Sequence, residues 1–263
     1  MNRLLPYLIM AFMSVLVISC QKEPDESILN QPPPATNCQL IKAEALDNGS
    51  VTDTAGYTYT NDKITKASYT DFYNTYDYSG TKMTKRSYFE SGSLTGYDTI
   101  LYNGDGTIRK VETYLANPVL PAPILFLEYV FTYSGGKLVN LLEKADTSFT
   151  GGGPVTLYEY NYTYTGNNIT RAIEKDYVDV VTDTLTYQYD NVSSYYKNIF
   201  LTDLFLSELN GQILPMAFSA NNVIRLSQGG DDYTLSYTVD SKKNLSEFLI
   251  DGEAYIRYSY KCQ

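Results

Sequence analysis

The chain has 263 residues, 43% of them hydrophobic and 19% charged, so it can bury a core within one or two domains. Its 20 basic and 30 acidic residues give a net charge of −10, which disfavours nucleic acid as a partner. It has no histidine, the commonest general base and transition-metal ligand, and no cofactor or metal is expected. The 27 tyrosines, 10 phenylalanines and absence of tryptophan favour strands.

Residues 1–19 have the pattern of a signal peptide. Arg3 precedes an apolar stretch that is shorter than the ~20 residues a membrane-spanning helix needs. The tail Val17-Ile18-Ser19-Cys20 resembles the lipobox of bacterial lipoproteins. That resemblance implies cleavage before Cys20 and acylation of this residue, which would anchor the mature chain in a membrane. The alternative is an ordinary signal peptide with a chance cysteine.

Residues 20–37 are expected to form a tether. The stretch Gln21–Glu26 (QKEPDE) is similar to the export signal that sends many Bacteroidota lipoproteins to the outer face of the outer membrane, so we expect a lipid-anchored, exterior location. A solvated charged stretch is the alternative. Three consecutive prolines at 32–34 impose an extended spacer. The folded body, residues 38–263, is expected to be a single β domain.

A recurring phrase predicts β-hairpins throughout the body. In Tyr162–Ile169 (YTYTGNNI), tyrosine and threonine alternate with the period of a strand, and Gly166, Asn167 and Asn168 suit a tight turn. Similar phrases begin at Tyr57, Tyr76, Phe131 and Tyr237. Their spacing is irregular, which excludes a solenoid of constant period.

The number of hairpins favours a closed or curled architecture. Seven or more turns imply a dozen or more strands, and sheets beyond roughly ten strands tend to curl, close or split. We therefore predict an all-β fold, an antiparallel meander of hairpins that forms a curled sheet or a barrel. One stretch departs from the strand pattern: residues 199–209 (IFLTDLFLSEL) have helical spacing, so we expect a short helix that covers one opening of the sheet.

These features together resemble a family of Bacteroidota outer-membrane lipoproteins of unknown function with a porin-like antiparallel β fold. The likeness rests on the lipobox, the proline-rich tether, the hairpins of the form Y-x-Y-turn-[IL]-x-[KR], and the phrase Phe218–Ile224 (FSANNVI). The hairpins are also distantly similar to the YD repeats of Rhs and teneurin shells. The resemblance implies a fold and a location, and it brings no activity or catalytic residue with it.

One strand carries a ladder of tyrosines, Tyr158, Tyr160, Tyr162 and Tyr164, on a single face. If exposed, the rings would form a stacking platform for a glycan or another flat ligand. If buried, they would form the inner face of the sheet, where cross-strand aromatic pairs contribute ~0.2 to 1 kcal/mol each. The one-faced alternation favours the structural interpretation.

No catalytic motif is recognisable, and we do not expect an enzyme. A carboxylate-based hydrolase would need two acids across a cleft, and the acids of suitable type, in predicted turns, are Asp231, Asp232, Asp251 and Glu253. The stretch from Asn103 to Glu112 fits most of a calcium-loop pattern, but Leu101 stands at the first ligand position, so a hairpin turn is predicted.

Three hypotheses about function therefore stand. The first is a binding or interaction module for a glycan or an envelope protein, the second a structural envelope component, and the third the hydrolase. The sequence does not indicate an oligomeric state.

Two cysteines remain once Cys20 is acylated, and the cell envelope is an oxidising compartment. Cys38 lies where the first strand should begin and Cys262 near the end of the last. In a meander that closes, these two strands become neighbours, so we predict a disulfide between Cys38 and Cys262 that fastens the seam. Two free thiols at opposite ends of an open sheet are the alternative.

Overall fold

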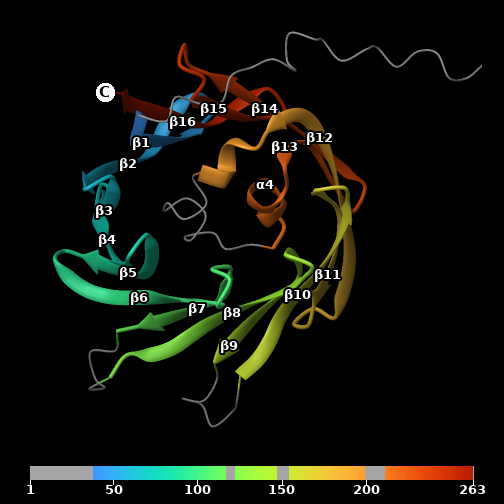
Figure 1. Cartoon of the computed structure of the whole chain (residues 1–263), viewed down its shortest axis with the longest axis horizontal. Helices are drawn as coiled ribbons and strands as arrows, with labels where there is room; N and C mark the ends of the chain where they lie inside the picture. Colours follow the sequence, from blue (N-terminus) through green and yellow to red (C-terminus); the bar gives the residue numbers. More distant parts are fainter. Residues whose placement is uncertain (1–37, 117–121, 147–153, 199–210, 263) are drawn as a thin grey trace, which may run out of the picture. The chain divides into compact units, whose positions relative to one another are not determined.

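The computed structural model describes residues 38–116, 122–146, 154–198 and 211–262. Its strands form a closed antiparallel barrel in which each strand pairs with its neighbours in sequence and β1 pairs with β16 (Figure 1). The predicted all-β antiparallel meander is confirmed, and of the two architectures left open the barrel is the one found. Among the residues described, no helix has the length and apolar character needed to cross a membrane.

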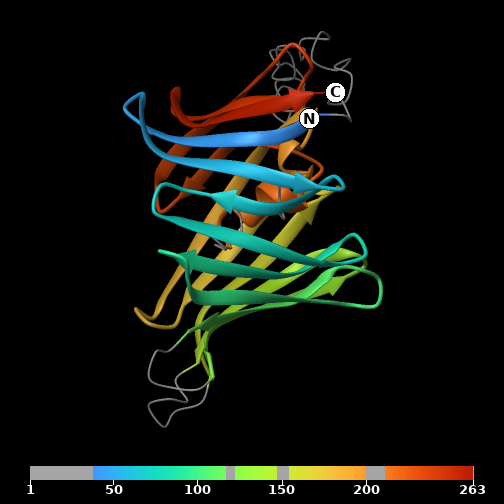
Figure 2. The ribbon, with the colours of Figure 1, turned by 90° about the vertical axis from the view of Figure 1, so that its left-hand side faces the viewer.

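Sixteen strands make up the wall, and they run obliquely around it (Figure 2). They are β1 (Cys38–Asp47), β2 (Ser50–Thr60), β3 (Lys63–Ser68), β4 (Phe72–Ser79), β5 (Lys82–Glu90), β6 (Ser93–Tyr102), β7 (Ile108–Leu115), β8 (Ile124–Ser134), β9 (Lys137–Asp146), β10 (Pro154–Thr165), β11 (Asn168–Asp176), β12 (Val181–Ser193), β13 (Asn221–Gln228), β14 (Asp231–Val239), β15 (Leu245–Ile250) and β16 (Glu253–Cys262). Between β12 and β13 lie a 3₁₀ helix, η2 (Tyr195–Asn198), and a short α-helix, α4 (Leu214–Phe218).

Tight turns join most of the strands, and the turn predicted after Tyr162–Thr165 joins β10 to β11. In the β1–β2 turn Asn48 and Gly49 have φ values of 49° and 75°, and in the β8–β9 turn Gly135 and Gly136 have values of 56° and 74°. Two central residues at positive φ match the right-handed twist of the flanking strands, and glycine and asparagine reach that region at the lowest cost.

Tyrosines of the repeated phrase join several hairpins to the strand before them. The hydroxyl of Tyr59 on β2 donates to the carbonyl of Leu40 on β1 at 2.8 Å, and that of Tyr102 on β6 donates to Met83 on β5 at 2.7 Å. Tyr237 on β14 makes the same bond to Val223 on β13. A tyrosine can bury its ring and still satisfy its hydroxyl in this way, which explains why the phrase recurs.

The barrel has two distinct ends. We call the end that holds Cys38, Cys262 and the turns at 61–62, 80–81, 103–107, 135–136, 166–167 and 240–244 the seam end. The turns at 48–49, 69–71, 91–92, 177–180, 229–230 and 251–252 lie at the opposite end, the mouth end. Strand direction alternates in an antiparallel meander, so successive turns fall at opposite ends.

The connection from β12 to β13 starts and finishes at the seam end and folds into the barrel, where α4 lies inside the ring of strands (Figure 1). We call its described part, residues 211–219, the plug. The hydroxyls of Tyr162 and Tyr187 on the wall donate to the carbonyls of Gly211 and Gln212 at 2.9 and 3.0 Å. A Cβ atom at position 211 would clash with the ring of Tyr160, so this close approach requires glycine.

Two predictions concern residues outside the described ranges. The helix expected at 199–209 falls in such a range, and the helix that the structure describes nearby is α4, which begins after it. Residues 1–37, with Cys20 and the expected tether, also lie outside the description.

The outer wall carries polar and charged side chains. Lys110 on β7, Glu128 on β8 and Lys144 on β9 form a ladder of ion pairs, with Nζ–Oε distances of 2.6 and 3.7 Å from Glu128. Lys175 and Glu159 continue it on β11 and β10 at 3.1 Å. The outer face of β7–β11 therefore carries a run of paired charges.

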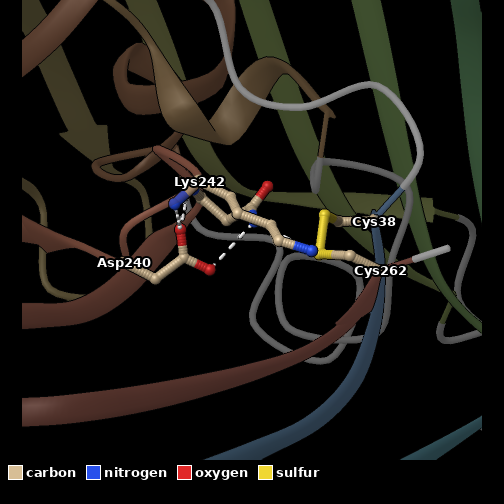
Figure 3. The surroundings of a disulfide bond; sticks show 5 residues. Cys38, Asp240, Lys242 and Cys262 are labelled. Atoms are coloured by element: carbon tan, nitrogen blue, oxygen red, sulfur yellow. Dashed lines mark hydrogen bonds between the residues drawn. A yellow bond between two sulfur atoms is a disulfide. The ribbon is translucent and has the colours of Figure 1, made fainter.

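The seam is closed by a disulfide between Cys38 and Cys262, the pairing expected from the sequence. The two residues are register partners on β1 and β16, with Cα atoms 4.0 Å apart. The β14–β15 turn lies beside the bond (Figure 3): the Asp240 carboxylate accepts hydrogen bonds from the backbone N–H of Lys242 and of Asn244, at 2.8 and 2.9 Å.

Removing this bond should lower the stability of the barrel. The cysteines are 224 residues apart, so the disulfide restricts a very long loop of the unfolded chain. We expect Cys38→Ser/Cys262→Ser to reduce the free energy of unfolding by roughly 2 to 4 kcal/mol. Urea denaturation followed by circular dichroism measures this. A reducing agent should lower the wild-type midpoint to that of the variant and leave the variant unchanged; equal midpoints for all samples would contradict the expectation.

Candidate functional site

A cavity of about 990 Å³ lies inside the barrel. Its walls come from β1, β2 and β12–β16, and its lining includes the exposed mouth-end residues Asp47, Asn48 and Glu253, so it opens at the mouth end. Tyr196 of η2 and Ile213 and Met216 from the plug also line it. The plug thus forms part of the cavity wall.

The deep part of the cavity is apolar and aromatic. Tyr196 packs edge-on against Phe248, with ring centroids 5.9 Å apart, and its hydroxyl lies 3.3 Å from that of Tyr258. Burial raises the pKa of Tyr196 well above its ordinary value, so the hydroxyl stays neutral. Val223 and Leu235 add aliphatic surface. A volume near 1,000 Å³ with such a lining is typical of small-molecule and peptide-anchoring pockets.

The predicted tyrosine ladder lies elsewhere. Tyr160 and Tyr162 are 3% and 6% exposed, and their parallel rings stack with centroids 6.5 Å apart. Tyr158 and Tyr164 are half-buried and pack against the same core, and none of the four lines the cavity. The ladder therefore serves the core and the plug in this structure, as the structural interpretation expected. The tyrosines that reach the cavity are Tyr69, Tyr187, Tyr196, Tyr233, Tyr255 and Tyr258.

The four turn carboxylates lie at the mouth end, all exposed. Asp232 pairs with Arg225 at 2.5 Å, and hydrogen bonds from Ser227 and Arg225 lower its pKa. Asp251 accepts the backbone N–H of Thr234 at 2.7 Å. Asp232 and Asp251 therefore have the environment of residues that stabilise turns and neighbouring strands.

The stretch from Asn103 to Glu112 is a hairpin turn, as predicted. Asp105 accepts the backbone N–H and the hydroxyl of Thr107 at 2.9 and 2.7 Å. Within the described residues there is no group of three or more acidic or cysteine side chains that could hold a metal ion.

Sequence reasoning missed an acidic pair inside the barrel. Glu143 on β9 and Glu174 on β11 flank the ladder tyrosines on β10, and Glu174, 9% exposed, accepts a hydrogen bond from the Gln212 amide of the plug at 2.9 Å. Burial, and secondly the charge of Glu174, raise the pKa of Glu143 to about 7. Neither carboxylate lines the cavity.

A neighbouring glutamate shows the opposite effect. Glu159 on β10 faces outward, where hydrogen bonds from Asn161, Tyr177 and Lys175 lower its pKa to about 2. In a strand, alternate side chains point to opposite faces. With the register of β9 and β10 known, this alternation would have assigned Glu143 to the inner face and Glu159 to the outer face.

A buried ion pair was also missed. Arg86 and Asp98 are each 1% exposed, with Nη2 and Oδ2 2.6 Å apart, and Thr113 donates to the other carboxylate oxygen at 2.8 Å. The pair faces the interior on β5 and β6, away from the cavity lining. Removing either partner would leave a buried charge uncompensated.

Exposed apolar side chains gather at the mouth end. Among the described residues every large apolar side chain that is exposed, except Ile41, lies in a mouth-end turn or within three residues of one end of a strand at the mouth. We call this set the apolar rim; it comprises Val51, Phe72, Leu94, Leu115, Phe126, Val155, Tyr177, Val178, Val180, Val181, Tyr233 and Tyr255. Two members of the apolar rim, Tyr233 and Tyr255, also line the cavity.

The described residues define a closed, plugged β-barrel with a cavity that opens at the mouth end. Comparisons with protein-family models and with curated proteins give no match. The crystal structure of a porin-like protein from Bacteroides uniformis is similar to this chain at 15% sequence identity, covers 87% of this chain and 99% of that one, and has a TM-score of 0.43.

The pKa of Glu143 predicts a pH-dependent stability. Its pKa rises from 4.5 to about 7 on folding, so the folded state holds the proton more tightly and stability falls as pH rises through this range. Glu143→Gln should match wild type near pH 5 and exceed it at pH 8 by roughly 1 to 2 kcal/mol, after discounting for partial exposure. Urea midpoints at the two pH values measure the difference.

Glu159→Gln is the matched control with the opposite sign. Folding lowers the pKa of Glu159, so the ionised side chain stabilises the folded state at any pH above the ordinary pKa of a glutamate. The variant lacks this stabilisation and should be less stable than wild type at pH 7. If Glu143→Gln lost stability equally at both pH values, the assigned environment of Glu143 would be wrong.

Proposed function

We propose that the protein is a lipid-anchored binding module of the outer membrane, displayed to the cell exterior, whose binding site is the mouth-end cavity. The observation that carries this proposal is a cavity of about 990 Å³ that opens at the end of the barrel opposite Cys38. The signal peptide and lipobox of residues 1–20 support the anchor.

The position of Cys38 supports this arrangement. Cys38 begins the described chain at the seam end, where the disulfide to Cys262 holds it, opposite the end at which the cavity opens. A chain anchored at Cys20 would then present its mouth away from the point of attachment. A cavity on the far side from the anchor is suited to meeting ligands outside the membrane.

The two competing functions have less support. A purely structural component needs no cavity, and the interior here is only partly filled by the plug. A carboxylate hydrolase needs an acid of raised pKa where a substrate can reach it. Glu143, whose pKa is raised, lies outside the cavity lining, and Asp251 and Glu253, which do line the cavity, are exposed residues at a turn. The lining instead combines aromatic rings with a few polar groups, as binding sites do.

An uncharged fluorescent probe tests whether the cavity accepts ligands. We expect N-phenyl-1-naphthylamine to bind the mature protein saturably and at equimolar ratio, with enhanced emission. Ala55→Trp and Ala254→Trp each place a large ring in the lining and should reduce the bound fraction about tenfold. Thr163→Trp on the exposed outer wall is the matched control and should bind like wild type. Equal binding by all four proteins, with unchanged melting temperatures, would contradict the proposal.

The anchor has its own test. In cells, the Cys20→Ala protein should leave the membrane fraction, since a single acylated site provides the hydrocarbon for stable residence. Protease added to intact cells should degrade the wild-type protein. A membrane-bound Cys20→Ala protein would rule out the lipid anchor, and a wild-type protein that resists protease until lysis would place it on the periplasmic face.

A further inference from the structure

The proposed cavity leaves most of the apolar rim unexplained. A small ligand inside the barrel would cover Tyr233 and Tyr255, which also line the cavity, but not the other ten rim residues, which extend over the mouth end from β2 to β12. Val180 is 87% exposed and Val178 63% exposed. Clustered apolar exposure of this kind marks an interaction surface, whereas scattered exposed apolar residues need no explanation.

The charges around the rim restrict the chemistry of the partner. Exposed carboxylates lie in or beside the mouth-end turns at Asp47, Asp71, Glu90, Asp179, Asp251 and Glu253. Among the described residues of the mouth-end turns and the three adjoining positions of each strand, the basic side chains are Lys66, Lys144 and Lys175. Lys144 and Lys175 are paired with outer-wall glutamates, and Lys66 lies 4.0 Å over the ring of Tyr73. The mouth is therefore strongly negative.

The cavity has the same bias as the mouth. Asp47, Asp53, Asp251 and Glu253 line its outer part, and no lysine or arginine occurs in the lining formed by the described residues. An anionic ligand would find no countercharge there, and an anionic membrane surface would be repelled. A second copy docked mouth to mouth would bring the same carboxylates together, which is equally unfavourable.

We propose that the mouth end binds a basic, amphipathic polypeptide segment, with apolar residues on the rim and in the cavity and basic residues over the surrounding carboxylates. This inference rests on the proposed function and names its partner. A polypeptide is long enough to cover the cavity and the rim together, as a small molecule is not. An amphipathic helix that lays one apolar face on an apolar surface is a common recognition mode, and opposite charges steer its approach.

The test compares two helical peptides of about 18 residues. Both carry leucines at the same positions of one helical face; the remaining positions are lysine in one peptide and glutamate in the other. Fluorescence anisotropy with the full-length mature protein measures both. We expect the lysine peptide to bind at equimolar ratio, at least about tenfold more tightly than the glutamate peptide, and to weaken as salt is raised. A lysine peptide of the same composition with its leucines scattered should also bind more weakly.

Variants localise the effect. Asp251→Asn/Glu253→Gln removes two mouth charges, and Val178→Ser/Val180→Ser removes apolar surface; each should weaken the lysine peptide about tenfold. Asp62→Asn/Asp77→Asn removes two exposed charges near the seam end and is the matched control, which should bind like wild type. An equal loss in this control would reduce the effect to net charge and overturn the proposal.

The remaining outcomes separate the two proposals. Equal binding of the lysine and glutamate peptides would overturn the inference about charge. If the cavity binds the uncharged probe or a glycan but the lysine peptide does not bind, the inference fails and the proposed function stands. If the probe does not bind and the tryptophan variants change nothing, the proposed function fails as well.

Discussion

The pairing of β1 with β16 is the constraint on which the rest of the molecule depends. Every strand of a sheet has two hydrogen-bonding edges, and a sixteen-stranded meander would leave one edge open on each of its outermost strands. Closure satisfies both edges, but it joins residues that are 224 positions apart. No short turn brings these two strands together, so their pairing carries the entropic cost of closing a very long loop. The disulfide lies on that pairing and keeps the two ends joined in the unfolded chain, which lowers the entropic cost of closure.

Closure creates an interior that must then be filled. A barrel of this many strands is wider than its own side chains can fill, which in large barrels leaves a channel or requires a plug. This chain uses both large rings and a plug: tyrosines from every even-numbered strand pack in the core, and residues 211–219 enter from the seam end. The hydroxyls of Tyr162 and Tyr187 hold the plug by its carbonyls. The cavity is the space that the plug and the rings leave at the other end.

Local chemistry explains why much of the fold could be predicted from the sequence. The alternation in Tyr162–Thr165 indicates a strand, and the turn residues of each phrase indicate positions with positive φ. Both signals depend only on residues that are close together in the sequence. The seam could also be predicted, because closure of a meander brings the first and last strands together and each of these strands carries one cysteine.

The site could not be predicted because it depends on which face points inward and what fills the interior. Glu143 and Glu159 look alike in sequence, and their opposite pKa shifts follow from facing the core and the outer wall. The tyrosine ladder has the composition of a binding face, but the plug covers it. Tyr196, Met216 and Phe248 line the cavity but come from three elements that share no sequence motif. No single stretch of the sequence therefore predicts the cavity.

The repeat also accounts for the difference between the two ends. Its lysine follows the turn, and each repeat turn lies at the seam end, so Lys63, Lys82 and Lys137 collect there. Each covers a tyrosine ring of the next hairpin, Tyr78, Tyr102 and Tyr164, with Nζ about 5 Å from the ring centroid. The mouth-end turns lie between repeats and are free of this requirement, so their residues can be acidic and apolar without disturbing the hairpins. A structural repeat confined to one end thus leaves the opposite end free to carry function, in the same way that loops at one end of a scaffold carry binding residues in other folds.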